Sequence, residues 1–178
     1  MAVAGPPASG KSTLAADLVA GLGAKAALVP MDGFHLDNRV LQARGLLGCK
    51  GAPETFDAFG FVRMVQRLAQ EDEVMIPVFD RAQDVAIAGA QVVGPDAEIA
   101  IIEGNYLLLD RQPWAALREI WDMSVFLDVP MPELERRLIR RWLYHDHSPA
   151  EALARARSSD LPNAQLVLTH SGPADIRI

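Results

Sequence analysis

The segment from Gly5 to Ser12 has the residue types and spacing of a phosphate-binding loop, because Gly-Pro-Pro-Ala-Ser-Gly-Lys-Ser fits the pattern G-x-x-x-x-G-K-[ST]. Its glycines allow a tight turn in which backbone N–H groups and the positive end of the next helix converge on an anion. Lys11 is expected to reach the β- and γ-phosphates, and the Ser12 hydroxyl to ligate Mg²⁺. The segment therefore indicates ATP and Mg²⁺ as cofactors. The expected binding residues are Gly5, Ser9, Gly10, Lys11, Ser12 and Thr13.

Two acids that follow apolar runs could act on the bound triphosphate. Asp32 follows the run 26–31, and Glu103 follows the run 98–102. A carboxylate at Asp32 can accept the proton of an acceptor hydroxyl and orient that hydroxyl for in-line attack. We assign Glu103 to magnesium, directly or through water. The competing role for Glu103 is a base that activates water for hydrolysis.

The elements that must position these residues are read from hydrophobic periodicity. Strands are expected at 2–4, 26–31, 74–79, 98–102, 124–129 and 176–178, and helices at 13–22, 59–70, 132–144 and 148–157, the last with Ser148 as its N-cap. The alternation predicts an α/β fold with a mostly parallel sheet flanked by helices. Together with the phosphate loop, it indicates a P-loop NTPase three-layer sandwich with a mostly parallel five-stranded sheet and a helical lid. Ligands bind beyond the carboxyl ends of parallel strands, so Asp32, Asp80 and Glu103 should face the crevice of the phosphate loop.

The helix expected at 132–144 carries two adjacent rows of like charge at i, i+4 spacing: Arg136 with Arg140 and Arg137 with Arg141. One interpretation is a solvated helix face bridged to Glu133 and Glu135. The other is a helical lid, over about 136–160, whose arginines close on the transferring phosphoryl group. If it is a lid, Arg137 and Arg141 are our choice for the catalytic arginines.

Several other polar residues have two interpretations each. His35, beside the proposed base, either binds the acceptor or makes a structural hydrogen bond. The segment 33–57 is too long for a plain connection and is a candidate acceptor-binding region, in which Arg39, Arg44 and Lys50 either hold a phosphate on the acceptor or solvate a loop. For the run 145–147, His-Asp-His, a surface loop is favoured over a metal site.

Length and composition favour one domain, 1–178, since the chain has 178 residues and is 50% hydrophobic. The net charge of -6 argues against nucleic-acid and anionic-membrane partners. The single cysteine excludes an intrachain disulfide, and no stretch has the length of a membrane span or the pattern of a secretion signal. We therefore expect a cytoplasmic protein without membrane insertion, and a homodimer stays an open alternative to a monomer.

The motifs, taken in order, resemble those of the phosphoribulokinase, uridine kinase and bacterial pantothenate kinase family. They are the phosphate loop, Asp32-Gly33-Phe34-His35, Pro53-Glu54-Thr55-Phe56-Asp57, Pro77-Val78-Phe79-Asp80-Arg81 and Ile102-Glu103-Gly104-Asn105-Tyr106. The resemblance implies transfer of phosphate from ATP to a hydroxyl of a small metabolite, with Asp32 as base and Glu103 near the metal. We assign acceptor binding to His35, Asp57, Asp80 and Arg81.

The resemblance extends to a compact bacterial branch described as kinases linked to fructose transport, through Asp160-Leu161-Pro162-Asn163-Ala164. Arg81 departs from the family pattern, because pantothenate and uridine kinases tend to have His there. The chain is also much shorter than a pantothenate kinase.

Two classes of function compete. The first is a small-molecule kinase, a phosphotransferase with an alcohol group as acceptor, acting on a sugar such as fructose or on a nucleoside- or pantothenate-like compound. The second is an accessory ATPase or switch that hydrolyses a nucleoside triphosphate without such an acceptor. No N-K-x-D element is visible, and a base at Asp32 would have little purpose in a pure hydrolase. The sequence therefore favours the kinase.

Overall fold

The protein, described over all residues 1–178 by a computed structural model, is built on a five-stranded sheet of order β2-β5-β1-β6-β7. Every neighbouring pair in this sheet is parallel. Its strands are β1 (Ala2–Ala4), β2 (Ala26–Pro30), β5 (Ile99–Gly104), β6 (Ser124–Phe126) and β7 (Ile176–Arg177). The expected five-stranded parallel sheet of a P-loop NTPase is confirmed.

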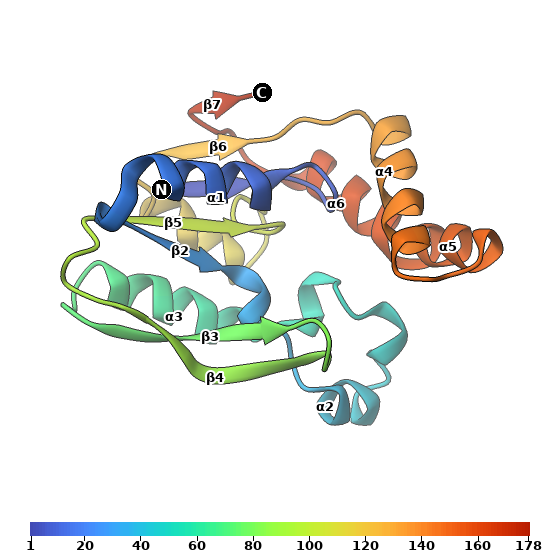
Figure 1. The fold of residues 1–178 in the computed structure, drawn as a ribbon, viewed down its shortest axis with the longest axis horizontal. Coiled ribbons are helices and arrows are strands. Elements are labelled where there is room, and N and C mark those ends of the chain that lie inside the picture. The colour runs from blue at the N-terminus through green and yellow to red at the C-terminus, as the bar shows by residue number, and fades with distance from the viewer.

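Helices cover both faces of the sheet and extend beyond one end of it (Figure 1). The helices are α1 (Lys11–Leu22), α2 (Asn38–Ala43), α3 (Ala58–Leu68), α4 (Met131–Tyr144), α5 (Pro149–Arg155) and α6 (Leu161–His170). Helix α1 lies on one face, α3 and α6 contribute to the core on the other, and α4 and α5 project past the carboxyl ends of the strands. The predicted three layers and helical extension are therefore present.

The sheet is apolar on both faces because both are covered. In β1, Ala2 and Ala4 face the larger cluster with Phe61 of α3 and Val167 of α6. Val3, between them, faces the smaller cluster with Ala15 of α1. Each successive side chain of a strand points to the opposite face, so three buried residues hold two helical layers together.

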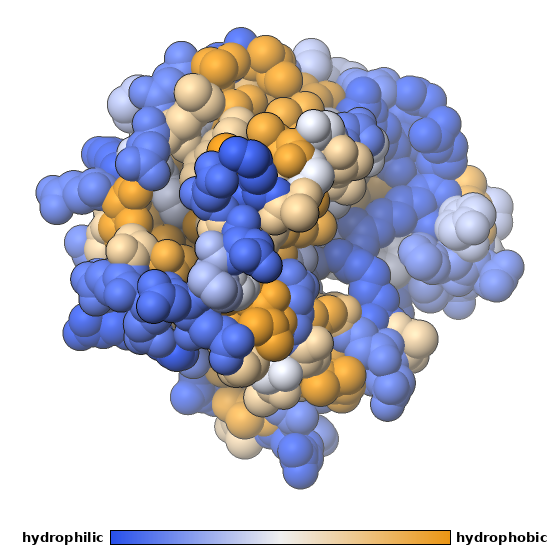
Figure 2. Space-filling view, turned by 60° about the vertical axis from the view of Figure 1, so that its left-hand side comes forward, coloured by the Kyte–Doolittle hydropathy of each residue, from blue (hydrophilic) through white to orange (hydrophobic).

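A two-stranded antiparallel hairpin, β3 (Val74–Asp80) and β4 (Val85–Val93), stands apart from the parallel sheet. The expectation that the strand at 74–79 joins the parallel sheet is therefore wrong, and β4 was not predicted. Only a short turn joins β3 to β4, and such a turn can only connect antiparallel strands. Met75, Ile87 and Val92 of this hairpin are exposed. Hydrophobic residues gather in several patches among hydrophilic ones on the face drawn in Figure 2.

The helices beyond the sheet begin and end at recognisable signals. Ser148 caps α5, as predicted, and Glu151 supplies the reciprocal contact of a capping box. A π-helical turn, Ala156–Asp160, joins α5 to α6, a helix that the sequence reading did not predict. None of the helices is both long and apolar enough to cross a lipid bilayer.

Candidate active site

The loop between β1 and α1 has the backbone of an anion cradle. A Cβ at Gly5 would lie 2.8 Å from Ser9 Oγ and 3.1 Å from Leu127 O, so a glycine is needed there. Gly10 has a φ of 102°, a left-handed conformation that other residues adopt at a cost. No side chain caps α1, which leaves its first N–H groups free for an anion. The buried Ser9 Oγ also has no hydrogen-bond partner, so the loop fits phosphate.

The loop opens onto a cleft of about 780 Å³ that gathers most of the predicted site residues. Asp32 reaches it from the turn after β2, and Glu103 from β5, the neighbour of β1 in the sheet. Among the other predicted residues, those that line the cleft are Gly10, Lys11, Ser12, Thr13, His35, Arg81 and Arg141. The carboxyl ends of adjacent parallel strands thus bring a base candidate and a metal-ligand candidate to the same place.

Ser12, in the first turn of α1, and Glu103 lie next to each other. Ser12 Oγ donates to Glu103 Oε2 at 3.1 Å, and Glu103 is only 7% exposed. Burial raises the pKa of Glu103, whereas the nearby Lys11 ammonium lowers it. Burial likewise lowers the pKa of Lys11, opposed by the carboxylates of Glu103 and Asp32. The two charges stabilise each other inside the protein.

These oxygen atoms fit magnesium, which is bound by one or two carboxylates together with substrate phosphates. No group of three or more His, Cys, Asp or Glu side chains is arranged as a metal site, the run 145–147 included. Ser12 and Glu103 would therefore hold Mg²⁺ jointly with a bound triphosphate. When bound, the ion neutralises charge on the phosphate oxygens.

Asp32 is fixed by contacts with the β3–β4 hairpin. Its carboxylate accepts a hydrogen bond from Arg81, in the turn that follows β3. Next to it, a Cβ at Gly33 would clash with the carbonyl oxygen of Pro77 in β3. Glycine therefore lets the hairpin cross directly against the turn that carries Asp32, which brings Arg81 within reach.

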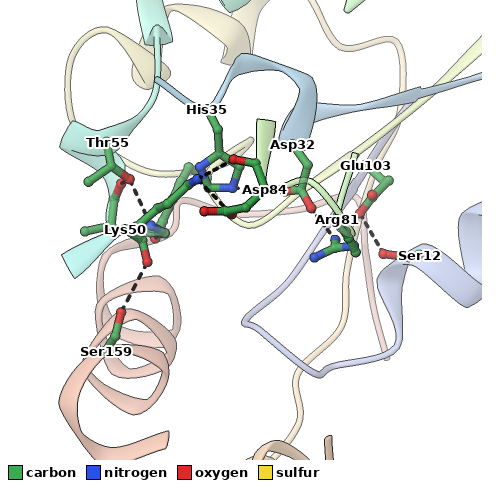
Figure 3. A network of polar contacts seen from close by, with 12 residues as sticks. Ser12, Asp32, His35, Lys50, Thr55, Arg81, Asp84, Glu103 and Ser159 are labelled. Atoms are coloured by element: carbon green, nitrogen blue, oxygen red, sulfur yellow. Dashed lines mark hydrogen bonds and ion pairs between the residues drawn. The ribbon is translucent and has the colours of Figure 1, made fainter. Parts of the chain in front are cut away.

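His35 lies on the far side of Asp32 from the phosphate loop (Figure 3). Its ring stacks on Phe56, with centroids 4.0 Å apart, and its Nε2 is 4.0 Å from Asp32 Oδ1. Burial lowers the pKa of His35 to about 4, so the imidazole is neutral at pH 7. His35 Nδ1 has no partner, so the structural hydrogen bond that was the alternative for His35 is absent at that nitrogen.

The two arginines chosen from the lid helix have different positions. Arg141 lines the cleft, and burial lowers its pKa. Arg137 does not line the cleft: its Nη1 donates to Ala8 O at 3.3 Å and to Ser9 O at 3.1 Å, and its Nε donates to Glu133 at 2.6 Å. The expectation that Arg137 closes on the phosphoryl group is therefore not met in this structure. Its guanidinium instead binds backbone carbonyl groups of the phosphate loop.

Two acids expected to bind the acceptor instead satisfy backbone N–H groups. Asp57 caps α3 by accepting from Gly60 N at 2.9 Å. Asp80 accepts from Ala82 N at 2.9 Å and from Gln83 N at 3.0 Å in the hairpin turn. Neither lines the cleft, so the expectation that Asp80 shares it with Asp32 and Glu103 is wrong. The reason is that β3 does not belong to the parallel sheet.

Residues from the helices beyond the sheet, which the sequence did not single out as site residues, complete the cleft wall. Trp142 Nε1 donates to Asp160 Oδ2 at 2.7 Å, and the guanidinium of Arg155 lies 5.0 Å from the Trp142 ring centroid. Asn163 and His145 also line the cleft. The segment 160–164, which resembles the fructose-transport-linked kinases, contains Asp160 and Asn163 on either side of Leu161-Pro162 at the start of α6. This pair of polar residues is the signal by which the sequence could have revealed these site residues.

This fold and this site define a P-loop protein that binds a nucleoside triphosphate. Comparison with known proteins narrows the class. The family model of the Phosphoribulokinase / Uridine kinase family matches residues 1–153. The chain belongs to this family of small-molecule kinases.

Three relatives illustrate its range. One is a "putative fructose transport system kinase" from Silicibacter sp. TM1040, known from a crystal structure. Its sequence is 53% identical to this chain, the match covers 99% of this chain and 87% of that one, and the TM-score is 0.96. A "putative uridine kinase" of Schizosaccharomyces pombe is 32% identical over 98% of this chain and 80% of its own. A pantothenate kinase of Clavibacter michiganensis is 32% identical over 87% of this chain, but the match spans only 56% of that longer protein.

Proposed function

We propose that the protein transfers the γ-phosphoryl group of ATP, with Mg²⁺, to an alcohol hydroxyl of a small metabolite. The observation that carries the proposal is the place of Asp32: it lies in one cleft between the phosphate loop and the half of that cleft lined by His35. An acceptor in that half would have its hydroxyl beside both a base and the phosphoryl group. An ATPase without an acceptor has no use for that half of the cleft.

Each residue contributes a defined part of the transfer. The N–H groups at the start of α1 bind phosphate oxygens, and Lys11 adds positive charge to the β- and γ-phosphates. Asp32 accepts the proton of the attacking hydroxyl while Arg81 holds the carboxylate in place. Arg141 reaches the cleft from the lid, where it stabilises charge on the transferring group and excludes water.

The acceptor candidates are those suggested by the relatives: a sugar such as fructose, a nucleoside, or a pantothenate-like compound. Likeness to the Silicibacter protein favours the sugar, since the two chains are 53% identical over nearly their full length. We also propose a cytoplasmic location, where ATP is abundant, and no nucleic-acid partner in view of the net charge of -6.

The test is a screen of sugars, polyols, nucleosides and pantothenate for acceptor-dependent ADP release, with the product identified by mass. A kinase releases ADP in proportion to acceptor consumed, whereas a switch releases it equally without acceptor. Lys11→Ala should abolish transfer and leave the fold intact, because this side chain neutralises phosphates and is not part of the hydrophobic core. Lys25→Ala, at an exposed pair with Glu98, is the matched control. Acceptor-independent ADP release throughout the screen would reject the proposal.

A further inference from the structure

The cleft divides at Asp32 into two halves with different chemistry (Figure 3). Ser12 and Glu103 lie on one side with the phosphate loop, and His35, Lys50 and Asp84 lie on the other. If Asp32 is the base, the second half holds the acceptor. The charges available there decide which acceptors fit.

Lys50 has no capacity left for an anionic ligand. Its Nζ donates to Asn38 Oδ1 at 2.7 Å and to Asp84 O at 3.1 Å, and pairs with Asp84 Oδ1 at 2.8 Å. An ammonium group has three N–H donors, and all three are used. The side chain is only 15% exposed, so these partners also shield it. Lys50 therefore fastens the segment 33–57 to the hairpin turn.

The other cationic side chains near the acceptor half either already have a partner, are neutral, or do not line the cleft. Arg81 pairs with Asp32, and His35 is neutral. Arg39 is 91% exposed, pairs with Asp37, and does not line the cleft; neither does Arg44. Arg141 and Arg155 line the same cleft with their guanidiniums 5.9 Å and 5.0 Å from the Trp142 ring centroid, and both lie near the Asp160 carboxylate.

The groups that remain for an acceptor are carboxylates and neutral polar atoms. The carboxylates of Asp32, Asp84 and Asp160 line the cleft and offset the charges of the cations beside them, which makes these cations poorer sites for an anion. His35 Nδ1 and Asn105 Oδ1 are buried without hydrogen-bond partners, and Asn163 is a buried amide in the same wall. Such groups suit hydroxyls, which can both donate and accept.

We infer that the acceptor is an electrically neutral polyhydroxyl compound, and that the Lys50–Asp84 pair excludes phosphorylated and carboxylated ones. This inference rests on the proposed kinase function and deepens it. The pair acts in two ways: it keeps the Lys50 charge from a ligand, and it places the Asp84 carboxylate at the cleft.

The experiment compares kcat/KM within matched pairs that keep a free primary hydroxyl: fructose against its 1-phosphate and 6-phosphate, glycerol against glycerate, and pantothenyl alcohol against pantothenate. We expect the neutral member of the preferred pair to be at least tenfold better. A kcat/KM for the charged member that equals or exceeds that of the neutral member would overturn the inference while leaving the kinase function standing. If no compound stimulates ADP release, the proposed function fails and takes this inference with it.

A variant tests the pair itself. Asp84→Asn suits the left-handed backbone of this residue, whose φ is 57°, and removes the ion pair with Lys50. The charged-to-neutral ratio of kcat/KM should then rise about tenfold. Asp37→Asn, which breaks a comparable pair with Arg39 outside the cleft, should leave that ratio unchanged. An unchanged ratio in Asp84→Asn would overturn the role given to the pair.

Discussion

Asp32 has contacts that suit a base rather than a nucleotide ligand: Arg81 on one oxygen and His35 beside the other. We therefore expect Asp32→Asn to keep ATP affinity but to reduce acceptor phosphorylation by about 10² to 10⁴, the usual contribution of a positioned general base. The measurement is the ATP dissociation constant beside acceptor-dependent turnover in the same variant.

The control for Asp32→Asn is Asp37→Asn, the same chemical change outside the cleft. If Asp32 only orients the hydroxyl, the loss will lie at the lower end of the range. A fall of less than tenfold, or equal losses of binding and turnover, would remove Asp32 from catalysis and reopen the ATPase alternative.

Glu103 is predicted to act through magnesium. Glu103→Gln keeps the shape of the side chain and a hydrogen-bonding partner for Ser12, but a neutral amide is a poorer ligand for a hard cation. The magnesium concentration for half-maximal activity should rise about tenfold, with a smaller change in nucleotide affinity measured without the metal. A magnesium titration like that of the unaltered protein would place Glu103 outside the metal shell.

At the residue scale, the sequence identified the groups that share a fixed spacing, such as Lys11 and Ser12, and strand-end acids of the parallel sheet, Asp32 and Glu103. It could not separate these acids from Asp80, which also ends a strand but accepts hydrogen bonds from backbone N–H groups of its own turn. A strand-end carboxylate has the same local pattern whether it binds a ligand or closes a turn. Only the sheet to which its strand belongs distinguishes the two.

At the scale of elements, the junction of Asp32 and Arg81 depends on how closely β3 crosses the turn after β2. Gly33→Ala should lower the free energy of unfolding by about 1–3 kcal/mol, because its Cβ would meet the Pro77 carbonyl and push the hairpin away. Urea denaturation measures this. Gly21→Ala in α1, where the Cβ meets nothing within 4 Å, should instead be neutral or stabilising by up to about 1 kcal/mol.

The same comparison checks a functional consequence. Since the hairpin carries Arg81, Gly33→Ala should also reduce acceptor phosphorylation, whereas Gly21→Ala should not. A Gly33→Ala protein with full stability would show that β3 can shift without cost.

The elements missed by the sequence reading share a physical cause. The β4 segment is rich in small residues, as the run from Ala86 to Ala90 shows. It has neither an alternation of apolar and polar side chains nor charged side chains that would distinguish an exposed face from a buried one. Helix α6 has Pro162 and Asn163 at its start, which resemble a loop when read locally. Both elements gain their structure from neighbours: β4 from β3, and α6 from the core around Val167.

At the scale of the whole molecule, His35 couples stability to pH. Its pKa of about 4 in the folded protein lies below the ordinary 6.5, so the unfolded chain binds more protons between these values. Its contribution to stability is complete above pH 6.5 and is lost as the pH falls toward 4, by up to about 3 kcal/mol at one pKa unit per 1.36 kcal/mol.

Urea unfolding at pH 7 and pH 4.5 tests this coupling. The unaltered protein should lose stability more steeply on acidification than the His35→Gln variant. The control is His170→Gln, a change at an exposed histidine, which should behave like the unaltered protein. Parallel losses in all three proteins would mean that His35 does not carry the effect.

The position of β1 has a consequence for how the chain folds. This strand lies in the middle of the parallel sheet, where Ala2 pairs with Ile102 on one side and with Ser124 on the other. The phosphate loop, although it belongs to the first dozen residues, therefore has no neighbouring strand on either side of β1 until β5 (Ile99–Gly104) and then β6 (Ser124–Phe126) have been synthesised. Closing loops of that length costs entropy before any contact compensates it, so assembly of the nucleotide site is a late and slow event in folding.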